Sequence, residues 1–304
     1  MIPYGKQDIN SEDIEAVINV LKSDFLTQGP KVPAFEKCVA KYAGAKYGCA
    51  ANSATSALHI ACLALGLGKG DELWTSPNTF VASSNCALYC GARVDFVDID
   101  PKTYNLCPDK LEHRLAKAKK LGKLPKVLVA VHLCGQSCDM KSIYKLSKIY
   151  GFKIIEDASH AVGAQYNKKS IGSCAYSDVT IFSFHPVKII TSGEGGLATT
   201  NDPVLACLMQ DRIPSCTTCK VDAASLCGSG DCSGLLAGGL NFTFDRFERA
   251  ADADTTVIVW YIMCETDALW STKFVGIATG ASLVAYLTSR SLRWTGMRSS
   301  ANER

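Results

Sequence analysis

The chain has 304 residues with a formal net charge of +3, and 47% of its residues are hydrophobic and 20% charged. This length allows one large α/β domain, alone or with a smaller one, and the composition is that of a globular protein. The small net charge and the lack of a basic stripe interleaved with aromatic residues argue against nucleic acid or an acidic membrane surface as a partner. No basic segment followed by an apolar run opens the sequence, so we expect no secretory signal and a cytoplasmic location.

Fifteen cysteines are many for a chain of this length. Without a secretory signal, we expect most of them to be reduced and buried as small hydrophobic residues. Four lie close together in the sequence, at Cys216, Cys219, Cys227 and Cys232, which leaves open a small zinc site. A single Cys-x-x-Cys with loosely spaced companions is not the paired pattern of structural zinc sites, so we predict no bound metal.

Three amphipathic helices are predicted before residue 66. Ser11 can cap the first helix, whose first turn carries acidic residues. Apolar residues recur at helical spacing over Ile14–Leu21, Phe35–Tyr42 and Leu58–Leu65. Asn52-Ser53 precedes the third of these helices, which should end near Gly66.

From residue 72 onwards, short apolar segments alternate with helical patterns. We expect strands over 72–75, 93–97, 126–131, 152–156 and 179–184, and helices over 79–89, 108–120 and 139–150. This alternation predicts an α/β fold with a mostly parallel sheet and helices on both of its faces. In such sheets ligands bind at the carboxyl ends of the strands, so the residues that follow each strand are the candidates for a site.

The composition changes near residue 212. Residues 1–212 contain 21 Lys and 3 Arg, whereas residues 213–304 contain 2 Lys and 6 Arg. The apolar stretches of the later part, Val257–Cys264 and Phe274–Leu287, are shorter than the roughly 20 residues of a membrane-spanning helix. We therefore predict a large domain over 1–212 and a divergent tail over 213–304, either poorly ordered or produced by a frameshift or a chimeric junction.

Lys188 is the first candidate for chemistry. It follows the predicted strand over 179–184 and precedes Gly193-Glu194-Gly195-Gly196. Glycines let the backbone come close to a planar cofactor, and a desolvated lysine can lose its proton and act as a nucleophile. A lone lysine in a loop is more often simply solvated, so the neighbouring motifs decide its role.

Those motifs fit pyridoxal 5′-phosphate (PLP). Asp157 follows the strand over 152–156, where its carboxylate can pair with the protonated pyridine nitrogen and keep the ring an electron sink. His160 lies three residues further on and can contact the ring or pack behind it. Ala54 and Thr55 open the third helix, where free N–H groups and the helix dipole favour a phosphate.

Two further residues complete the pattern. Ser183 can add a hydroxyl to the phosphate site, and Phe80 can stack on the pyridine ring. Each residue alone is equally explained by a helix cap, a solvated acid or a core aromatic. Their order along the chain is what predicts a PLP site, with Lys188 and Asp157 as its catalytic residues.

With these motifs the sequence resembles the DegT-type nucleotide-sugar aminotransferases, which are fold-type I PLP enzymes. The resemblance covers residues 1 to about 212 and rests on Asn52–Leu58, Asn78–Ala82, Val97–Asp100, Glu156–Ala161 and Phe182–Gly196. It implies a three-layer αβα large domain with an atypical tail in place of the usual small domain. It also implies that Lys188 bonds to PLP, that Asp157 contacts the pyridine nitrogen, and that Ala54, Thr55, Phe80, His160 and Ser183 contact the cofactor.

Within the family, Ile2–Gly5, Asp24–Pro30 and Phe184–Lys188 are most similar to the branch of pseudaminic acid biosynthesis. The resemblance implies that L-glutamate donates the amino group and that the C4 ketone of a UDP-linked 4-keto-6-deoxy-N-acetylhexosamine accepts it. It implies substrate contacts from Tyr4, Phe25 and His185, and a homodimer.

Two other interpretations stay open. The chain can be a catalytically inactive remnant that keeps a PLP-binding fold, or another fold-type I PLP enzyme such as a desulfurase or an aldolase. The family's asparagine-tyrosine-arginine motif is matched only faintly by Gly239–Phe242, with Thr243 where arginine is expected, which favours the remnant. Lys188 and Asp157 favour catalysis, and the lysine argues against the relatives that carry histidine there and act as sugar dehydratases.

Overall fold

The computed structural model describes residues 7–27 and 29–212 and, after them, five strands between residues 241 and 288. The chain divides into two compact units, Met1–Cys219 and Lys220–Arg304. Each unit is considered by itself.

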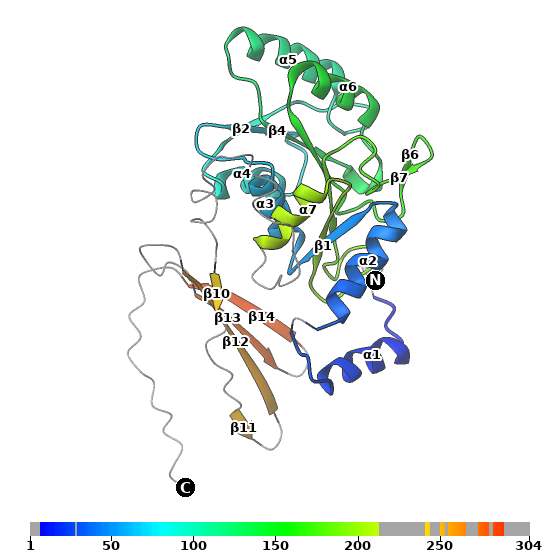
Figure 1. Cartoon of the computed structure of the whole chain (residues 1–304), viewed down its shortest axis with the longest axis vertical. Helices are drawn as coiled ribbons and strands as arrows, with labels where there is room; N and C mark the ends of the chain where they lie inside the picture. Colours follow the sequence, from blue (N-terminus) through cyan, green and yellow to red (C-terminus); the bar gives the residue numbers. More distant parts are fainter. Residues whose placement is uncertain are drawn as a thin grey trace. The chain divides into compact units, whose positions relative to one another are not determined.

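The first unit is built on a seven-stranded sheet (Figure 1). In sheet order its strands are β1 (Tyr47–Ala51), β9 (Gly196–Thr200), β8 (Val179–Ser183), β5 (Lys153–Asp157), β4 (Val127–Val131), β2 (Glu72–Thr75) and β3 (Arg93–Phe96). Strand β9 runs antiparallel to both of its neighbours. All other pairs in this sheet are parallel, so the predicted mostly parallel sheet is confirmed.

Helices cover both faces of this sheet, which gives three αβα layers. On one face lie α3 (Ala54–Ala64), α4 (Ala82–Tyr89) and α7 (Pro203–Asp211), and on the other α5 (Pro108–Lys120) and α6 (Met140–Tyr150). Strand β4 is buried along its whole length because it alternates between the two cores: Val127, Val129 and Val131 face α3 and α4, and Leu128 and Ala130 face α5 and α6.

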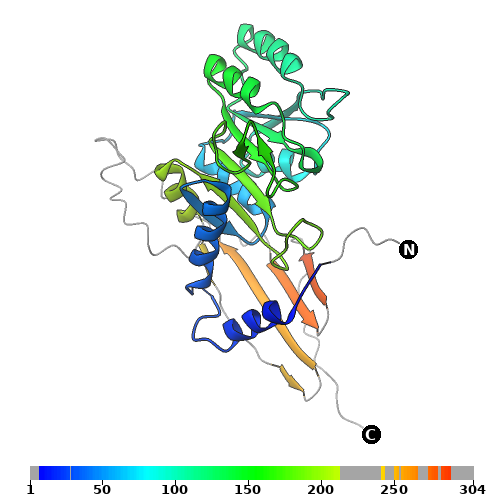
Figure 2. The same ribbon diagram turned by 90° about the vertical axis from the view of Figure 1, so that its right-hand side faces the viewer.

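The remaining elements lie outside these layers. Helix α2 (Lys31–Ala43) packs through Phe35, Val39 and Ala43 against Phe182 and Phe184. Helix α1 (Ser11–Leu21) has no buried residue and lies away from the seven-stranded sheet in both views (Figures 1 and 2). A 3₁₀ turn, η1 (Leu133–Gly135), follows β4, and β6 (Gln165–Tyr166) pairs with β7 (Lys169–Ser170) in a short hairpin.

Two predicted helix starts are wrong. The cap of α1 is Asn10 and not Ser11, because the Asn10 side chain accepts the N–H groups of Glu12 and Asp13 while the Asp13 carboxylate accepts the Asn10 N–H. The helix expected over 79–89 begins at Ala82, since residues 77–80 form a loop after β2.

The second unit contains five strands in its described residues. They are β10 (Asn241–Thr243), β11 (Ala250–Asp252), β12 (Thr255–Glu265), β13 (Lys273–Thr279) and β14 (Ser282–Thr288), all paired antiparallel. The two apolar stretches noted in the sequence fall on β12, β13 and β14. In the part of the chain that the structure describes, no helix is long and apolar enough to cross a membrane.

Candidate active site

The strand register brings the predicted site segments to one edge of the sheet. Ser183 at the end of β8 pairs with Gly196, and Gly196 pairs with Ala51 at the end of β1. Asp157 at the end of β5 pairs with Ile181 of the neighbouring β8. The loops that carry Ser53, Phe80, His160 and Lys188 therefore all leave the sheet at this edge.

The first turn of α3 lies directly against β9. Ser53 caps the helix, and its Oγ accepts the Ser56 N–H at 3.2 Å, which leaves the N–H groups of Ala54 and Thr55 for an acceptor outside the helix. A Cβ atom on Gly196 would lie 2.3 Å from the Ser53 carbonyl carbon and 2.4 Å from the Ala54 nitrogen. Only glycine permits this approach, so Gly196 places the helix N-terminus beside the end of β8.

Asp157 is buried, with only 5% of its surface exposed, and its carboxylate accepts three hydrogen bonds. Its Oδ2 accepts the Ser83 hydroxyl at 2.6 Å, and its Oδ1 accepts the Ser159 hydroxyl at 2.7 Å and the Ser159 N–H at 3.2 Å. The Ser83 hydroxyl is also 2.7 Å from the Thr79 hydroxyl. These contacts fix the orientation of the carboxylate at the sheet edge.

Lys188 and His160 stand near this carboxylate. Lys188 is half-buried in a turn closed by its own N–H, which donates to the His185 carbonyl at 2.9 Å. Burial lowers the pKa of His160, the nearby Lys188 charge lowers it further, and Asp157 opposes the shift. The three side chains are therefore within electrostatic reach of one another.

The other predicted residues are spread more widely. Phe80 follows β2 and is 73% exposed, so its ring is available for stacking. Phe25 is exposed in the loop between α1 and α2. The His185 ring accepts the Val187 N–H at 3.3 Å through Nδ1, and its Nε2 is 3.7 Å from Glu194 Oε1. Tyr4 lies outside the described residues.

A buried polar network that sequence reasoning missed lies on the other face of the sheet, behind Asp157. Glu156 Oε2 is 2.8 Å from His132 Nε2, and Glu156 Oε1 accepts the hydroxyls of Ser177 and Thr180. Burial alone would raise the pKa of Glu156, but the hydrogen bonds from these three residues outweigh it and hold the pKa below its usual range. The network joins β4, β5 and β8 just before Asp157.

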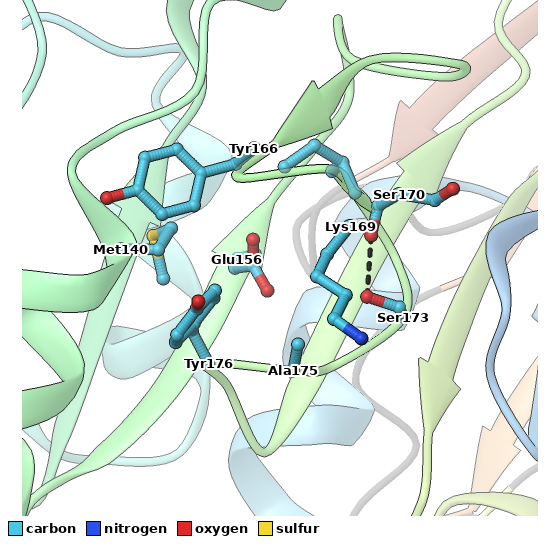
Figure 3. Close-up of a pocket in the computed structure, with 9 residues that line it drawn as sticks. Met140, Glu156, Tyr166, Lys169, Ser170, Ser173, Ala175 and Tyr176 are labelled. Atoms are coloured by element: carbon cyan, nitrogen blue, oxygen red, sulfur yellow. Dashed lines mark hydrogen bonds between the residues drawn. The ribbon is translucent and has the colours of Figure 1, made fainter.

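His132 is fixed on its other side as well. Its Nδ1 accepts the Cys138 N–H at 3.2 Å, so Nε2 carries the proton that it donates to Glu156. Its backbone N–H donates to the Asp157 carbonyl at 3.1 Å. The Glu156 side chain points into a small cavity of about 10 Å³, between Met140, Tyr166 and Tyr176 (Figure 3).

A larger surface cavity of about 580 Å³ lies between α5 and α6, and neither Lys188 nor Asp157 lines it. Within the described residues no group of three or more His, Cys, Asp or Glu side chains is arranged to hold a metal ion. The four cysteines considered above for a zinc site, from Cys216 to Cys232, lie outside the described residues.

Comparison with known proteins decides the family. Residues 7–217 match the DegT/DnrJ/EryC1/StrS aminotransferase family. The chain belongs to this family. The resemblance predicted over residues 1 to about 212 is thereby confirmed for residues 7–212.

Curated relatives in the family include the spore coat polysaccharide biosynthesis protein SpsC of Bacillus subtilis, 43% identical over 205 residues. The UDP-4-amino-4,6-dideoxy-N-acetyl-beta-L-altrosamine transaminase of Campylobacter jejuni is 45% identical over 206 residues. Each alignment covers 67% of this chain and, respectively, 51% and 53% of the relative. The chain thus spans about half the length of the curated relatives it matches.

Solved structures of the family share the fold. Helicobacter pylori PseC, an aminotransferase of pseudaminic acid biosynthesis, superposes with a TM-score of 0.63 at 34% identity, covering 68% of this chain and 54% of PseC. The sugar aminotransferase Spr1654 of Streptococcus pneumoniae, solved in its PLP form, gives 0.62 at 30% identity, covering 69% and 57%. The predicted fold class, the large domain of a fold-type I PLP enzyme, is confirmed.

Proposed function

We propose that this chain is a PLP-dependent nucleotide-sugar aminotransferase. It would move an amino group from L-glutamate to the C4 ketone of a UDP-linked 4-keto-6-deoxy-N-acetylhexosamine, in the biosynthesis of pseudaminic acid or a related surface glycan. The observation that carries the proposal is the meeting of a helix N-terminus, a buried strand-end carboxylate and a lysine at one sheet edge. The Campylobacter jejuni relative named as a UDP-sugar transaminase supports the substrate class, and PseC, named as an aminotransferase of pseudaminic acid biosynthesis, supports the pathway.

The residues at this edge fit PLP. The Ala54 and Thr55 N–H groups and the Ser183 hydroxyl would bind the phosphate, in a cradle where Gly196 leaves no room for a Cβ atom. Asp157, oriented by Ser83 and Ser159, would accept the N–H of the protonated pyridine. When bound, PLP supplies an electron-withdrawing ring that stabilises the negative charge left on a carbon after it loses a proton.

Lys188 would hold the cofactor through its Nζ and then act as the base. Released from the cofactor by the incoming amine, its Nζ would take the proton from the donor carbon that bears the amino group and deliver a proton to the cofactor in the same half-reaction. In the second half-reaction it would move a proton the opposite way, onto C4 of the sugar. His160 is within electrostatic reach of Lys188, and because the pKa of His160 is lowered, its ring is mainly uncharged at neutral pH. It therefore adds no second positive charge beside the Lys188 amine.

Phe80, Phe25, His185 and Tyr4 complete the proposed site. The exposed Phe80 ring would cover one face of the pyridine. Phe25, His185 and Tyr4 would contact the sugar nucleotide. From the family resemblance we also propose a homodimer in the cytoplasm, which light scattering of the purified chain and cell fractionation would test.

The decisive experiment is visible absorption of the purified chain with added PLP, followed by borohydride reduction and peptide mapping. We expect an absorption band and a label on Lys188, both lost in Lys188→Arg and both kept in Lys169→Arg, which removes an exposed lysine of β7. L-glutamate should bleach the band. A folded chain without the band would refute the proposal and favour the inactive remnant, and a band that only other amino donors bleach would favour another fold-type I enzyme.

A further inference from the structure

Three cysteines and a histidine gather between α3 and α4. His59 and Cys62 are one turn apart on α3, and Cys86 and Cys90 are one turn apart at the end of α4. Cys62 and Cys86 are buried in the same core cluster, and Cys90 packs against it. The thiols of Cys86 and Cys90 both interact with the Cys62 thiol, and Cys90 also interacts with the His59 ring. The proposed aminotransferase chemistry uses none of these four side chains.

Cys90 and Cys62 differ in environment. Cys62 is fully buried, whereas Cys90 is half-buried at the C-cap of α4. A hydrogen bond from Cys62 lowers the pKa of Cys90 to about 6, with help from the His59 ring and the Arg212 guanidinium and against burial, which raises it. Hydrogen bonds with Cys86 and with Cys90, together with burial, raise the pKa of Cys62. Cys90 is thus the thiolate of the pair and Cys62 its proton-bearing partner.

We propose that Cys90 is an oxidation site for hydroperoxides and that Cys62 resolves the oxidised form into a Cys62–Cys90 disulfide. Reactive cysteines combine partial exposure with a cationic environment and a neighbouring thiol. Cys90 combines all three. The disulfide would link α3, which begins at the candidate phosphate site, to α4, which carries Ser83.

The chemistry balances in two steps. The Cys90 thiolate attacks one oxygen of the hydroperoxide, the O–O bond breaks, and the leaving alkoxide or hydroxide takes a proton from solvent as Cys90 becomes a sulfenic acid. The Cys62 sulfur then attacks the Cys90 sulfur, the S–O bond breaks, and the hydroxide leaves as water with the Cys62 proton. Two thiols and one hydroperoxide give one disulfide, one alcohol (water, when the oxidant is hydrogen peroxide) and one water.

The pH dependence of alkylation tests the environment of Cys90. At pH 6 a thiol with the pKa of Cys90 is about half ionised and an ordinary thiol about 0.3%, so Cys90 has roughly 160-fold more thiolate. The Cys90 thiolate is less basic than an ordinary thiolate, which makes it roughly 13-fold less nucleophilic. The alkylation rate of Cys90 at pH 6 should therefore exceed that of an ordinary thiol about tenfold. At pH 8.5 an ordinary thiol is itself about half ionised, and the advantage disappears.

The first measurement is therefore iodoacetamide labelling of the full chain at pH 6 and pH 8.5, with rates for each cysteine from peptide mass spectrometry. Cys38 and Cys134 are the internal references because both are exposed. We expect Cys90 to react about tenfold faster than either at pH 6 and no faster at pH 8.5. Equal or slower labelling of Cys90 at pH 6 would overturn the proposal.

The second measurement is treatment with hydrogen peroxide followed by mapping of linked peptides. We expect a Cys62–Cys90 link in the unmodified chain and in Cys86→Ala, and no link in Cys62→Ala, where dimedone should trap the Cys90 sulfenic acid. Cys62 and Cys86 are both fully buried, so the two alanine variants remove similar packing. A link between Cys86 and Cys90, or oxidation of Cys38 and Cys134 ahead of Cys90, would show the assignment to be wrong.

Discussion

Gly196 offers a direct test of how the candidate phosphate site is built. In Gly196→Ala the new methyl group would lie 2.3 Å from the Ser53 carbonyl carbon and 2.4 Å from the Ala54 nitrogen, about 1 Å closer than an ordinary contact. The atoms it meets are backbone, so no side chain can rotate away. Either β9 or the start of α3 must move, at a cost of about 1–3 kcal/mol in the free energy of unfolding.

The matched control is Gly68→Ala, because a Cβ atom at Gly68 has no neighbour within 4 Å. We expect the Tm of Gly196→Ala to be about 2–12 °C below that of the control. We also expect PLP titration to give a weaker binding curve, because the displaced N–H groups would no longer meet the phosphate. If both variants have the same Tm and bind PLP equally, the close contact at Gly196 does not position α3, and the account of the phosphate site is wrong.

Three other substitutions test the rest of the site. Ser83→Ala removes a 2.6 Å hydrogen bond to the buried Asp157 carboxylate, so urea unfolding should show a loss of about 1.5–3 kcal/mol, and an unchanged midpoint would contradict the contact. The pKa of Glu156 is lowered on folding. The ionised Glu156 carboxylate therefore stabilises the fold fully above its pKa in the unfolded chain, about 4.3, and this stabilisation is lost as the pH falls through its pKa in the folded chain. Glu156→Gln should be less stable than the parent chain at neutral pH, and unfolding midpoints from pH 7 to 3 should converge in acid rather than stay parallel. Phe80→Ala should change stability by less than about 0.5 kcal/mol because the ring is 73% exposed, yet PLP titration should show weaker binding.

The strands that the sequence predicted correctly carry large apolar or β-branched residues. The strands expected between residues 72 and 184 agree with the observed bounds to within one residue at each end, because runs such as Val127–Val131 are apolar throughout. Strands β1 and β9 were not predicted, because Tyr47–Ala51 and Gly196–Thr200 consist mostly of small residues that do not alternate between apolar and polar. Their pairing depends on partners about 150 residues away, which no local pattern reveals.

The sequence also predicted where the site residues would meet, because the carboxyl ends of neighbouring strands share one edge of a sheet. It did not predict the contact of Ser83, in the first turn of α4, with Asp157, which lies 74 residues further along the chain. The only sequence signal for it is the spacing of four residues from Thr79. The contacts between Glu156 and His132 and among Cys62, Cys86 and Cys90 also join residues far apart in the sequence, so they were not predicted either.

The change in composition near residue 212 is best tested in the coding DNA. The family match ends at residue 217, close to the point where lysine gives way to arginine. A frameshift changes the amino acids but leaves the bases as they were, so base composition should be continuous across codon 212. One of the other two frames should then encode a family-like continuation with an asparagine-tyrosine-arginine motif. A chimeric junction would instead change the base composition at that point and give no such continuation in any frame, and a tail that is native to the gene would show continuous composition and no hidden motif.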